Sequence, residues 1–172
     1  MARKLLNIPT VIQSNDSDCG SCALQSILRF YEIKETHKKI KELLCLEPKH
    51  GADIPNIVAV AELYGLKVVS RTGLFIHNLI EAVDNGYPAM VEIQIKKRKD
   101  MDWRDSNNYG HYCVVKGYDS NRNKIFLKDP LQSDSRILSF EDMIERWHGY
   151  ATNDIIYQRW AMIAKGRKNK NQ

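Results

Sequence analysis

The sequence lacks any long apolar run. No segment approaches the ~18 consecutive apolar residues that a membrane-spanning helix requires, and the segment from Met1 to Pro9 carries positive charge without the uninterrupted apolar stretch of a signal peptide. Cysteine is scarce, with four in 172 residues. In a chain of this length without a secretion signal, these cysteines are expected to stay reduced. Together the absences predict a cytoplasmic protein with no direct membrane insertion.

Internal repeats and low-complexity segments are missing before the basic C-terminal end. With 172 residues, 43% of them hydrophobic, the chain can bury one substantial core but is short for two. We expect a single domain over residues 1–164 and a basic flexible tail over residues 165–172. Lys and Arg outnumber Asp and Glu by 26 to 21, with the excess in this tail and in residues 96–99. Such runs are typical of solvated loops and chain ends, so no nucleic-acid partner is expected.

Apolar side chains in the first half of the chain recur at helical spacing. Thr36 is a favourable N-cap, and Asp53 and Gly65 are suited to begin and end a further helix. The predicted helices span residues 19–31, 37–44, 54–64 and 77–85. A short extended lead-in over residues 5–12 precedes them, where Pro9 limits strand pairing.

The second half of the chain changes to a period of two. Alternation from Pro88 to Ile95 and from Tyr112 to Tyr118 indicates strands, and the polar residues 119–123 form a turn to the next strand. The predicted strands span residues 67–71, 88–95, 112–118, 124–128 and 155–164, and one more helix spans residues 141–148 after Ser139 as N-cap. Helices followed by strands predict an α+β fold, with an N-terminal helical layer packed on a C-terminal antiparallel sheet.

Residues 96–110 form a connection longer than a hairpin requires. Connections of this length in compact domains tend to be functional or mobile, and this one ends at His111. Trp103 and Tyr109 within it either pack on the sheet or line a cleft, and the sequence leaves both alternatives open.

Cys19 follows a run of small polar residues at the start of the first predicted helix. Unpaired backbone N–H groups and the helix dipole at such a position favour a thiolate. We therefore expect Cys19 to cap this helix and to act as a nucleophile. The alternative is a small buried residue at a helix start, so the case depends on what other side chains accompany it.

A thiol nucleophile needs a base, a group that orients the base, and donors for the oxyanion. His111 is expected at the start of a strand, where its side chain can project toward the helix that carries Cys19. Asp129 closes the next strand, and Pro130 holds it in an extended conformation. The two strands would then place Asp129 beside the His111 imidazole. Gln13 precedes Cys19 in the polar lead-in, and its amide together with the Cys19 N–H could form a two-donor oxyanion hole.

The other four histidines are expected to be structural. His37 and His77 lie near predicted helix starts, His50 lies in a loop with Pro and Gly, and His148 lies at a predicted helix end. Histidines at helix ends are more often caps or surface residues than catalysts.

Several segments stand in an order and spacing that resemble a known family. They are Gln13, Asp18-Cys19-Gly20, residues 110–119, Lys128-Asp129-Pro130, residues 139–142 and Trp147. The chain resembles, over about residues 8–163, the bacteriocin-processing family of papain-like cysteine peptidases, also known as double-glycine leader peptidases.

The resemblance implies a papain-like fold with Cys19 as nucleophile, His111 as base and acid, Asp129 as orienting group and Gln13 as oxyanion donor. It implies no cofactor or metal, and a peptide or protein substrate cut after a Gly-Gly or Gly-Ala pair that ends a leader. Family members are often the cytosolic N-terminal domain of peptide-exporting ABC transporters, which makes such an exporter a candidate partner. Another peptide, or an amide, remains an alternative substrate.

Two functions from other classes are alternatives. Cys19-Gly20-Ser21-Cys22 is a C-x-x-C motif at a helix start, which suits thiol-disulfide exchange. Redox motifs of that kind normally follow a buried strand, whereas a polar run precedes Cys19, so Cys22 is expected to be a buried helix residue. A non-catalytic peptide-binding domain would use the same cleft without the thiol chemistry.

Overall fold

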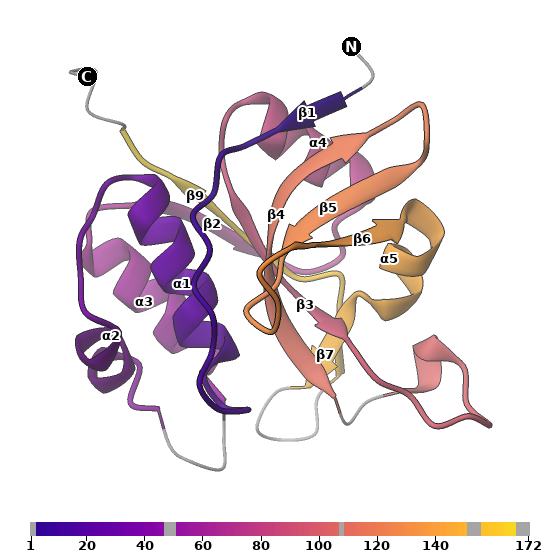
Figure 1. Ribbon diagram of the computed structural model, residues 1–172, viewed down its shortest axis with the longest axis horizontal. Helices are drawn as coiled ribbons and strands as arrows, with labels where there is room; N and C mark the ends of the chain where they lie inside the picture. Colours follow the sequence, from indigo (N-terminus) through magenta and orange to yellow (C-terminus); the bar gives the residue numbers. More distant parts are fainter. Residues whose placement is uncertain (1–2, 47–50, 107–108, 151–155, 168–172) are drawn as a thin grey trace.

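A computed structural model of the protein describes residues 3–46, 51–106, 109–150 and 156–167. The first three helices and the central strands occupy opposite sides of the molecule (Figure 1). Three helices gather on one side: α1 (Cys19–Phe30), α2 (His37–Leu43) and α3 (Ile54–Leu63). On the other side lie the central strands β3 (Ala89–Gln94), β4 (Gly110–Asp119) and β5 (Lys124–Lys128). This arrangement confirms the α+β fold with an N-terminal helical layer.

The helices begin and end where the sequence favours it. The Thr36 side chain accepts a hydrogen bond from the Lys39 N–H at 3.2 Å and so caps α2. Asp53 precedes α3, and Pro55 occupies its first turn, where a missing N–H costs nothing. After α3, Gly65 adopts a φ of 80°, a left-handed conformation that ends the helix.

A seven-stranded antiparallel sheet forms the second layer. Its order is β2-β9-β3-β4-β5-β6, and β1 pairs with the C-terminal half of β4. The further strands of this sheet are β1 (Arg3–Leu5), β2 (Lys67–Arg71), β6 (Ser135–Ser139) and β9 (Ala161–Lys165). A separate two-stranded sheet pairs β7 (His148–Tyr150) with β8 (Ile156–Gln158). The remaining helices are α4 (Ile76–Asp84), the 3₁₀ turn η1 (Trp103–Asp105) and α5 (Phe140–Arg146).

The core lies between α1 and the sheet. Leu24, Ile27 and Leu28 of α1 have no solvent exposure, and α1 packs against β4, whose Val114 is also fully buried. Removing such side chains from water stabilises the fold by about 1.5–3 kcal/mol each. In the part of the chain that the structure describes, no helix has both the length and the apolar character needed to cross a bilayer.

Two expectations about elements were wrong, and two strands were missed. The strand expected over residues 155–164 is two strands in different sheets, because Arg159 has a left-handed φ of 53° that turns the chain between β8 and β9. His148 begins β7 instead of ending a helix, since α5 stops at Arg146. The strands β6 and β7 were not expected. The lead-in is irregular after β1 ends at Leu5, in agreement with the limit that Pro9 sets. Most of the expected basic tail, residues 168–172, lies outside the described residues.

The long connection between β3 and β4 packs on α5. The Arg146 guanidinium lies 3.7 Å from the centroid of the half-buried Trp103 ring, within the range of a cation–π contact. Ser106 is buried, and its hydroxyl donates to the Lys96 carbonyl at 2.8 Å. Tyr109, by contrast, is 44% exposed. Trp103 therefore packs against a helix, whereas Tyr109 faces solvent near His111.

Candidate active site

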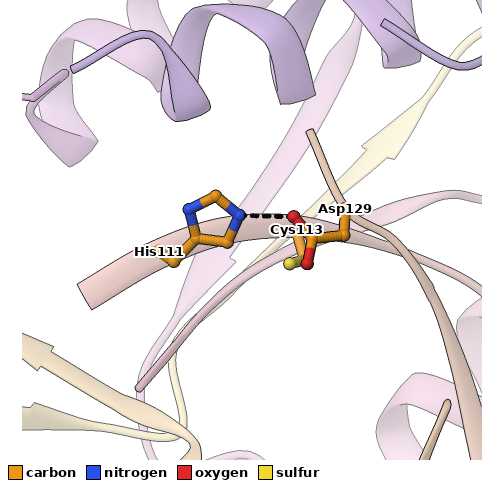
Figure 2. Close-up of side chains that lie close together, drawn as sticks. All are labelled: His111, Cys113 and Asp129. Carbon is orange, nitrogen blue, oxygen red and sulfur yellow. Dashed lines mark hydrogen bonds and ion pairs between the residues drawn. The ribbon is translucent and has the colours of Figure 1, made fainter. Parts of the chain in front are cut away.

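His111 and Asp129 lie side by side on neighbouring strands. The register pairs Val114 of β4 with Lys128 of β5, so the residues near the start of β4 come beside those that follow β5. His111 Nε2 donates to Asp129 Oδ1 at 2.6 Å (Figure 2). Both side chains are almost fully buried, at 3% and 0% exposed. The strand adjacency predicted from the sequence is thus observed in atomic detail.

Asp129 has two further partners. Its Oδ1 accepts from the Leu131 N–H at 2.9 Å, and its Oδ2 accepts from Nε and Nη2 of Arg136, each at 2.6 Å. Burial raises the pKa of Asp129, but the hydrogen bond and charge of His111, the Leu131 N–H and the Arg136 charge outweigh it and lower the pKa to about 2. Asp129 is therefore an ionised carboxylate at neutral pH. Arg136 was missed from the sequence because β6 was missed.

Cys19 is the first residue of α1, and Asp18 rather than Cys19 occupies the N-cap position. The Cys19 side chain is 6% exposed, so it does not stand open to solvent. Gly20 permits this burial: a Cβ there would lie 2.8 Å from Cβ of Ala52 and 3.2 Å from Cδ2 of Tyr112. The absence of a side chain at Gly20 lets the first turn of α1 approach β4 and places Cys19 near His111.

Asp18 holds the polar segment before α1 in place. Its side chain is 0% exposed and pairs with Lys41 Nζ at 2.7 Å. The other carboxylate oxygen accepts from the Ser14 hydroxyl at 2.8 Å and the Asn15 amide at 2.9 Å. Burial alone would raise the pKa of Asp18, yet Lys41 and Ser14 lower it overall. The polar run therefore folds around an ionised carboxylate directly before Cys19.

Burial lowers the pKa of His111, but hydrogen bonds with Asp129, Cys113 and Cys19 outweigh burial and raise the pKa to about 12. Cys19 lies at the start of α1, which packs against β4, the strand that carries His111. Since Nε2 bonds to Asp129, Nδ1 is the nitrogen left for a thiol, and it lies on the far side of the ring from Asp129 in Figure 2. The expected contact of His111 with Asp129 is observed, and the approach of the Cys19 thiol to this pair stays a prediction.

Gln13 joins the site through its backbone. Its N–H donates to the Pro130 carbonyl at 2.9 Å, which ties the lead-in to the turn that carries Asp129. Its side-chain Nε2 donates to the Asn15 carbonyl at 2.9 Å. Within the described residues, the buried Oε1 of Gln13 has no hydrogen-bond partner. The amide therefore has one N–H engaged within the lead-in.

Cys113 is a site neighbour that sequence reasoning did not single out. His111, Cys113 and Asp129 bring their potential ligand atoms within 4.8 Å of one another. This donor set could hold a metal ion, but hydrogen bonds from His111, Leu131 and Arg136 already occupy the Asp129 carboxylate. Burial raises the pKa of the Cys113 thiol. The arrangement therefore fits a hydrogen-bonded proton-transfer site better than a metal site.

The remaining candidates have structural surroundings. Cys22 has no solvent exposure and burial raises its pKa to about 12, the opposite of an exchange-active thiol. Its Sγ lies 3.4 Å from His37 Nε2, which also contacts the Ser21 hydroxyl at 2.8 Å. His148 Nε2 bonds to the Ser106 carbonyl at 2.7 Å, and the His77 ring stacks on Phe75. His50 lies outside the described residues.

One hollow of the described surface lies away from these residues. It has a volume of about 700 Å³ and is lined by residues of α1 and of the segment leading into α2, among them Gln25, Arg29 and His37. None of Cys19, His111 or Asp129 lines it. This hollow and the proposed chemistry are thus separate features of the surface.

A thiol at the start of a buried helix and a histidine–aspartate pair on an antiparallel sheet define a papain-like cysteine peptidase fold. A family model matches residues 5–155, most of the chain, and the protein belongs to the Peptidase_C39 like family. The resemblance seen in the sequence motifs is therefore confirmed. Membership in this family supports a cysteine-type peptidase.

Solved structures agree on the fold. The peptidase domain of Streptococcus ComA, a bifunctional ABC transporter involved in quorum sensing, is 23% identical with a TM-score of 0.66, covering 95% of this chain and 98% of that one. A C39-like peptidase from Bacillus anthracis, described as putative, is 18% identical with a TM-score of 0.74, covering 97% and 99%. At these identities the similarity shows the fold alone.

A third structure contains a ligand. It is a double glycine motif protease from an AMS/PCAT transporter in complex with the leader peptide, 15% identical with a TM-score of 0.64, covering 95% of each chain. A comparison with curated proteins gives no match for this chain.

Proposed function

We propose that the protein is a cysteine peptidase that cuts a peptide bond with Cys19, His111, Asp129 and Gln13. The observation that carries the proposal is the buried 2.6 Å hydrogen bond from His111 to Asp129, on a strand against which the helix that begins at Cys19 packs. A nucleophile, a base and an orienting group in contact are the minimum set for thiol catalysis. Residues 1–164 form the peptidase domain in this proposal, and residues 165–172 take no part in the chemistry.

His111 moves the protons of the reaction. Its raised pKa keeps the ring an imidazolium, with the proton on Nδ1, while Cys19 attacks as a thiolate at the carbonyl carbon of the scissile bond. Asp129 holds the opposite nitrogen, which fixes the tautomer and stabilises the imidazolium. His111 then returns the proton to the leaving amine as the C–N bond breaks. A water molecule, deprotonated by the same ring, hydrolyses the thioester and frees Cys19.

Gln13 and the Cys19 backbone N–H act as oxyanion donors. An amide NH₂ group carries two N–H donors, and the bond to Asn15 uses one of those of Gln13. The second can reach a substrate oxygen. The bond from the Gln13 N–H to Pro130 fixes the backbone that carries this side chain. Preorganised donors of this kind typically contribute about 10²–10³-fold to the rate.

The substrate is a precursor peptide with a Gly-Gly-type leader, cut after its small residues. The leader peptide bound by the AMS/PCAT protease, which shares this fold, motivates this choice. Residues with little or no side chain suit a site in which the nucleophile is itself only 6% exposed. A peptide-exporting ABC transporter is the proposed partner, because the similar ComA domain belongs to a bifunctional ABC transporter. A cytoplasmic location follows from that partnership.

The test is cleavage of peptides that carry a leader ending in Gly-Gly, with mass spectrometry of the products. Cleavage after the second glycine is expected for the native protein, and none for Cys19→Ala, which keeps its circular dichroism spectrum. A matched peptide with Val-Val at the same place should remain intact. Binding of the leader peptide without cleavage, unchanged by Cys19→Ala, would show a peptide-binding domain instead and refute the proposal.

A further inference from the structure

Arg136 on β6 contacts the site through Asp129. Its Nε and Nη2 both lie 2.6 Å from Oδ2 of Asp129, whose side chain is 0% exposed. The Arg136 side chain is itself only 22% exposed. This pair differs from a surface ion pair, because the carboxylate is out of contact with water and depends on its partners for compensation. The positive charge of Arg136 therefore compensates the buried negative charge of Asp129.

Each oxygen of the Asp129 carboxylate accepts hydrogen bonds from two donors. Oδ1 accepts from His111 Nε2 at 2.6 Å and from the Leu131 N–H at 2.9 Å, while Oδ2 accepts both Arg136 donors. Two donors on each oxygen match the roughly four lone-pair sites of a carboxylate. Since the guanidinium is a rigid planar fork, its position restricts rotation of the carboxylate about the Cβ–Cγ bond.

We infer that Arg136 is a positioning residue of the peptidase. By clamping Oδ2 of Asp129, it holds Oδ1 against His111 Nε2 and so keeps Nδ1 of the ring directed at the Cys19 thiol. The inference rests on the proposed function and extends it by one residue, Arg136, which acts on the catalytic set through Asp129. It also assigns a role to β6, the edge strand that brings Arg136 opposite Leu127 of β5.

Loss of Arg136 has two physical consequences. The carboxylate of Asp129 becomes free to turn away from His111, and a displacement of about 1 Å in a catalytic group can cost on the order of 10²-fold in rate. The buried carboxylate also loses the cation that helps keep it ionised, so the pKa of Asp129 rises. The site should then lose activity first on the acid side.

The experiment compares Arg136→Ala, Arg136→Gln and Arg136→Lys with Arg122→Ala. Arg122 is an exposed arginine in the β4–β5 turn, at the opposite end of these strands from Asp129, and serves as the matched control. The alkylation rate of Cys19 by iodoacetamide is measured against pH, alongside kcat/KM for the leader peptide. Alkylation needs no knowledge of the substrate.

The two neutral variants should lower both rates by about 10- to 100-fold and move the acid limb of the pH profile upward. Arg136→Lys, which keeps the charge without the fork, should fall between them and the native protein. Millimolar guanidinium should restore part of the rate in Arg136→Ala alone. Arg122→Ala should match the native protein. If Arg136→Ala does not fold, the similarly sized Arg136→Gln carries the same comparison.

A second readout separates this inference from the proposed function. In the Cys19→Ala background, the low-field proton NMR signal of the His111–Asp129 hydrogen bond is recorded with and without Arg136→Gln. A signal that shifts or disappears supports the positioning role even if the native protein cleaves nothing, in which case only the proposed function fails. A folded neutral variant with the native signal and the native alkylation profile would overturn the inference and leave the peptidase proposal standing.

Discussion

The carboxyl group of Glu92 on β3 accepts a hydrogen bond from the Tyr157 hydroxyl on β8. This contact joins the main sheet to the small β7–β8 sheet, and Gly149 of β7 packs so closely that a Cβ there would lie 2.5 Å from Cδ of Glu92. Glu92 is 7% exposed. A titratable side chain is thus enclosed where the two sheets meet.

Glu92 should make stability depend on pH. Burial, partly offset by Tyr112 and His111, raises the pKa of Glu92 from 4.5 to about 8. The folded protein then binds a proton that the unfolded chain releases, so the free energy of unfolding falls as pH rises from 4.5 to about 8. The slope approaches about 1.4 kcal/mol per pH unit.

Glu92→Gln should remove this slope. Its melting temperature relative to the native protein should rise progressively between these two pH values, as measured by thermal unfolding. Glu81→Gln, at an exposed position on α4, is the control and should show no such trend. A difference between Glu92→Gln and native protein that is constant with pH would contradict the prediction.

Gly20→Ala should displace Cys19, the residue directly before it. A Cβ at Gly20 would lie 2.8 Å from Cβ of Ala52, before α3, and 3.2 Å from Cδ2 of Tyr112 on β4, so the first turn of α1 must shift away from both. Overpacking of this kind costs about 1–3 kcal/mol in stability. The displacement of Cys19 should slow its alkylation by about tenfold or more.

Gly51→Ala is the matched control, because among the described residues beyond its chain neighbours a Cβ at Gly51 would have no atom within 4 Å. Thermal unfolding and iodoacetamide kinetics measure both variants. Equal stability and equal Cys19 reactivity in the two would show that close packing at Gly20 does not position the thiol.

Cys19 should react faster with iodoacetamide than Cys45, although exposure alone gives the opposite order. Cys45 is exposed, whereas Cys19 is 6% exposed. Cys19 lies at the start of α1, against the strand that carries His111, and this position is the reason to expect an activated nucleophile. Mass spectrometry of the labelled peptides over time gives both rates. His111→Gln should reverse the order, and a native protein in which Cys45 reacts first would argue against an activated thiol.

Lys41→Met should destabilise the protein by about 1–3 kcal/mol, because it leaves the Asp18 carboxylate buried without its cation. This loss of stability is smaller than for a fully buried ion pair, because the Lys41 side chain is 33% exposed. Since Lys41 and Ser14 lower the pKa of Asp18, its contribution is present above pH 3.8 and is lost on acidification below it. The Lys41→Met deficit should shrink over that same acid range.

Lys39→Met provides the comparison, since Lys39 and Glu42 form an exposed pair at 3.7 Å that should contribute little. Chemical denaturation measures both variants. Adding Asp18→Asn to Lys41→Met should recover part of the loss. A Lys41→Met protein as stable as Lys39→Met would mean that Asp18 does not need the pair.

The sequence predicted those features that depend on local signals. Thr36 and Gly65 mark helix ends through their own chemistry, and α1 shows a clear apolar period, so these helices appear where expected. The contact of His111 with Asp129 was also predictable, because two adjacent strands joined by a short turn leave little freedom in their pairing.

Features that depend on distant packing were not predictable. Glu92 stands in an alternating strand, where a charged residue indicates a solvent-facing side, but the β7–β8 sheet packs against it. Arg136 lies in a short segment without clear alternation, so neither β6 nor its bond to Asp129 could be expected. Arg159 has a side chain that gives no sign of a left-handed φ, yet it divides the last predicted strand.

The backbone hydrogen bond from Gln13 to Pro130 gives this protein a built-in reporter. Gln13 lies at the start of the polar segment that leads to Cys19. Pro130 directly follows Asp129 at the start of the next turn. When either segment opens, the amide proton of Gln13 becomes free to exchange with deuterium from solvent. The exchange rate of that single proton therefore measures how often the two halves of the catalytic machinery separate.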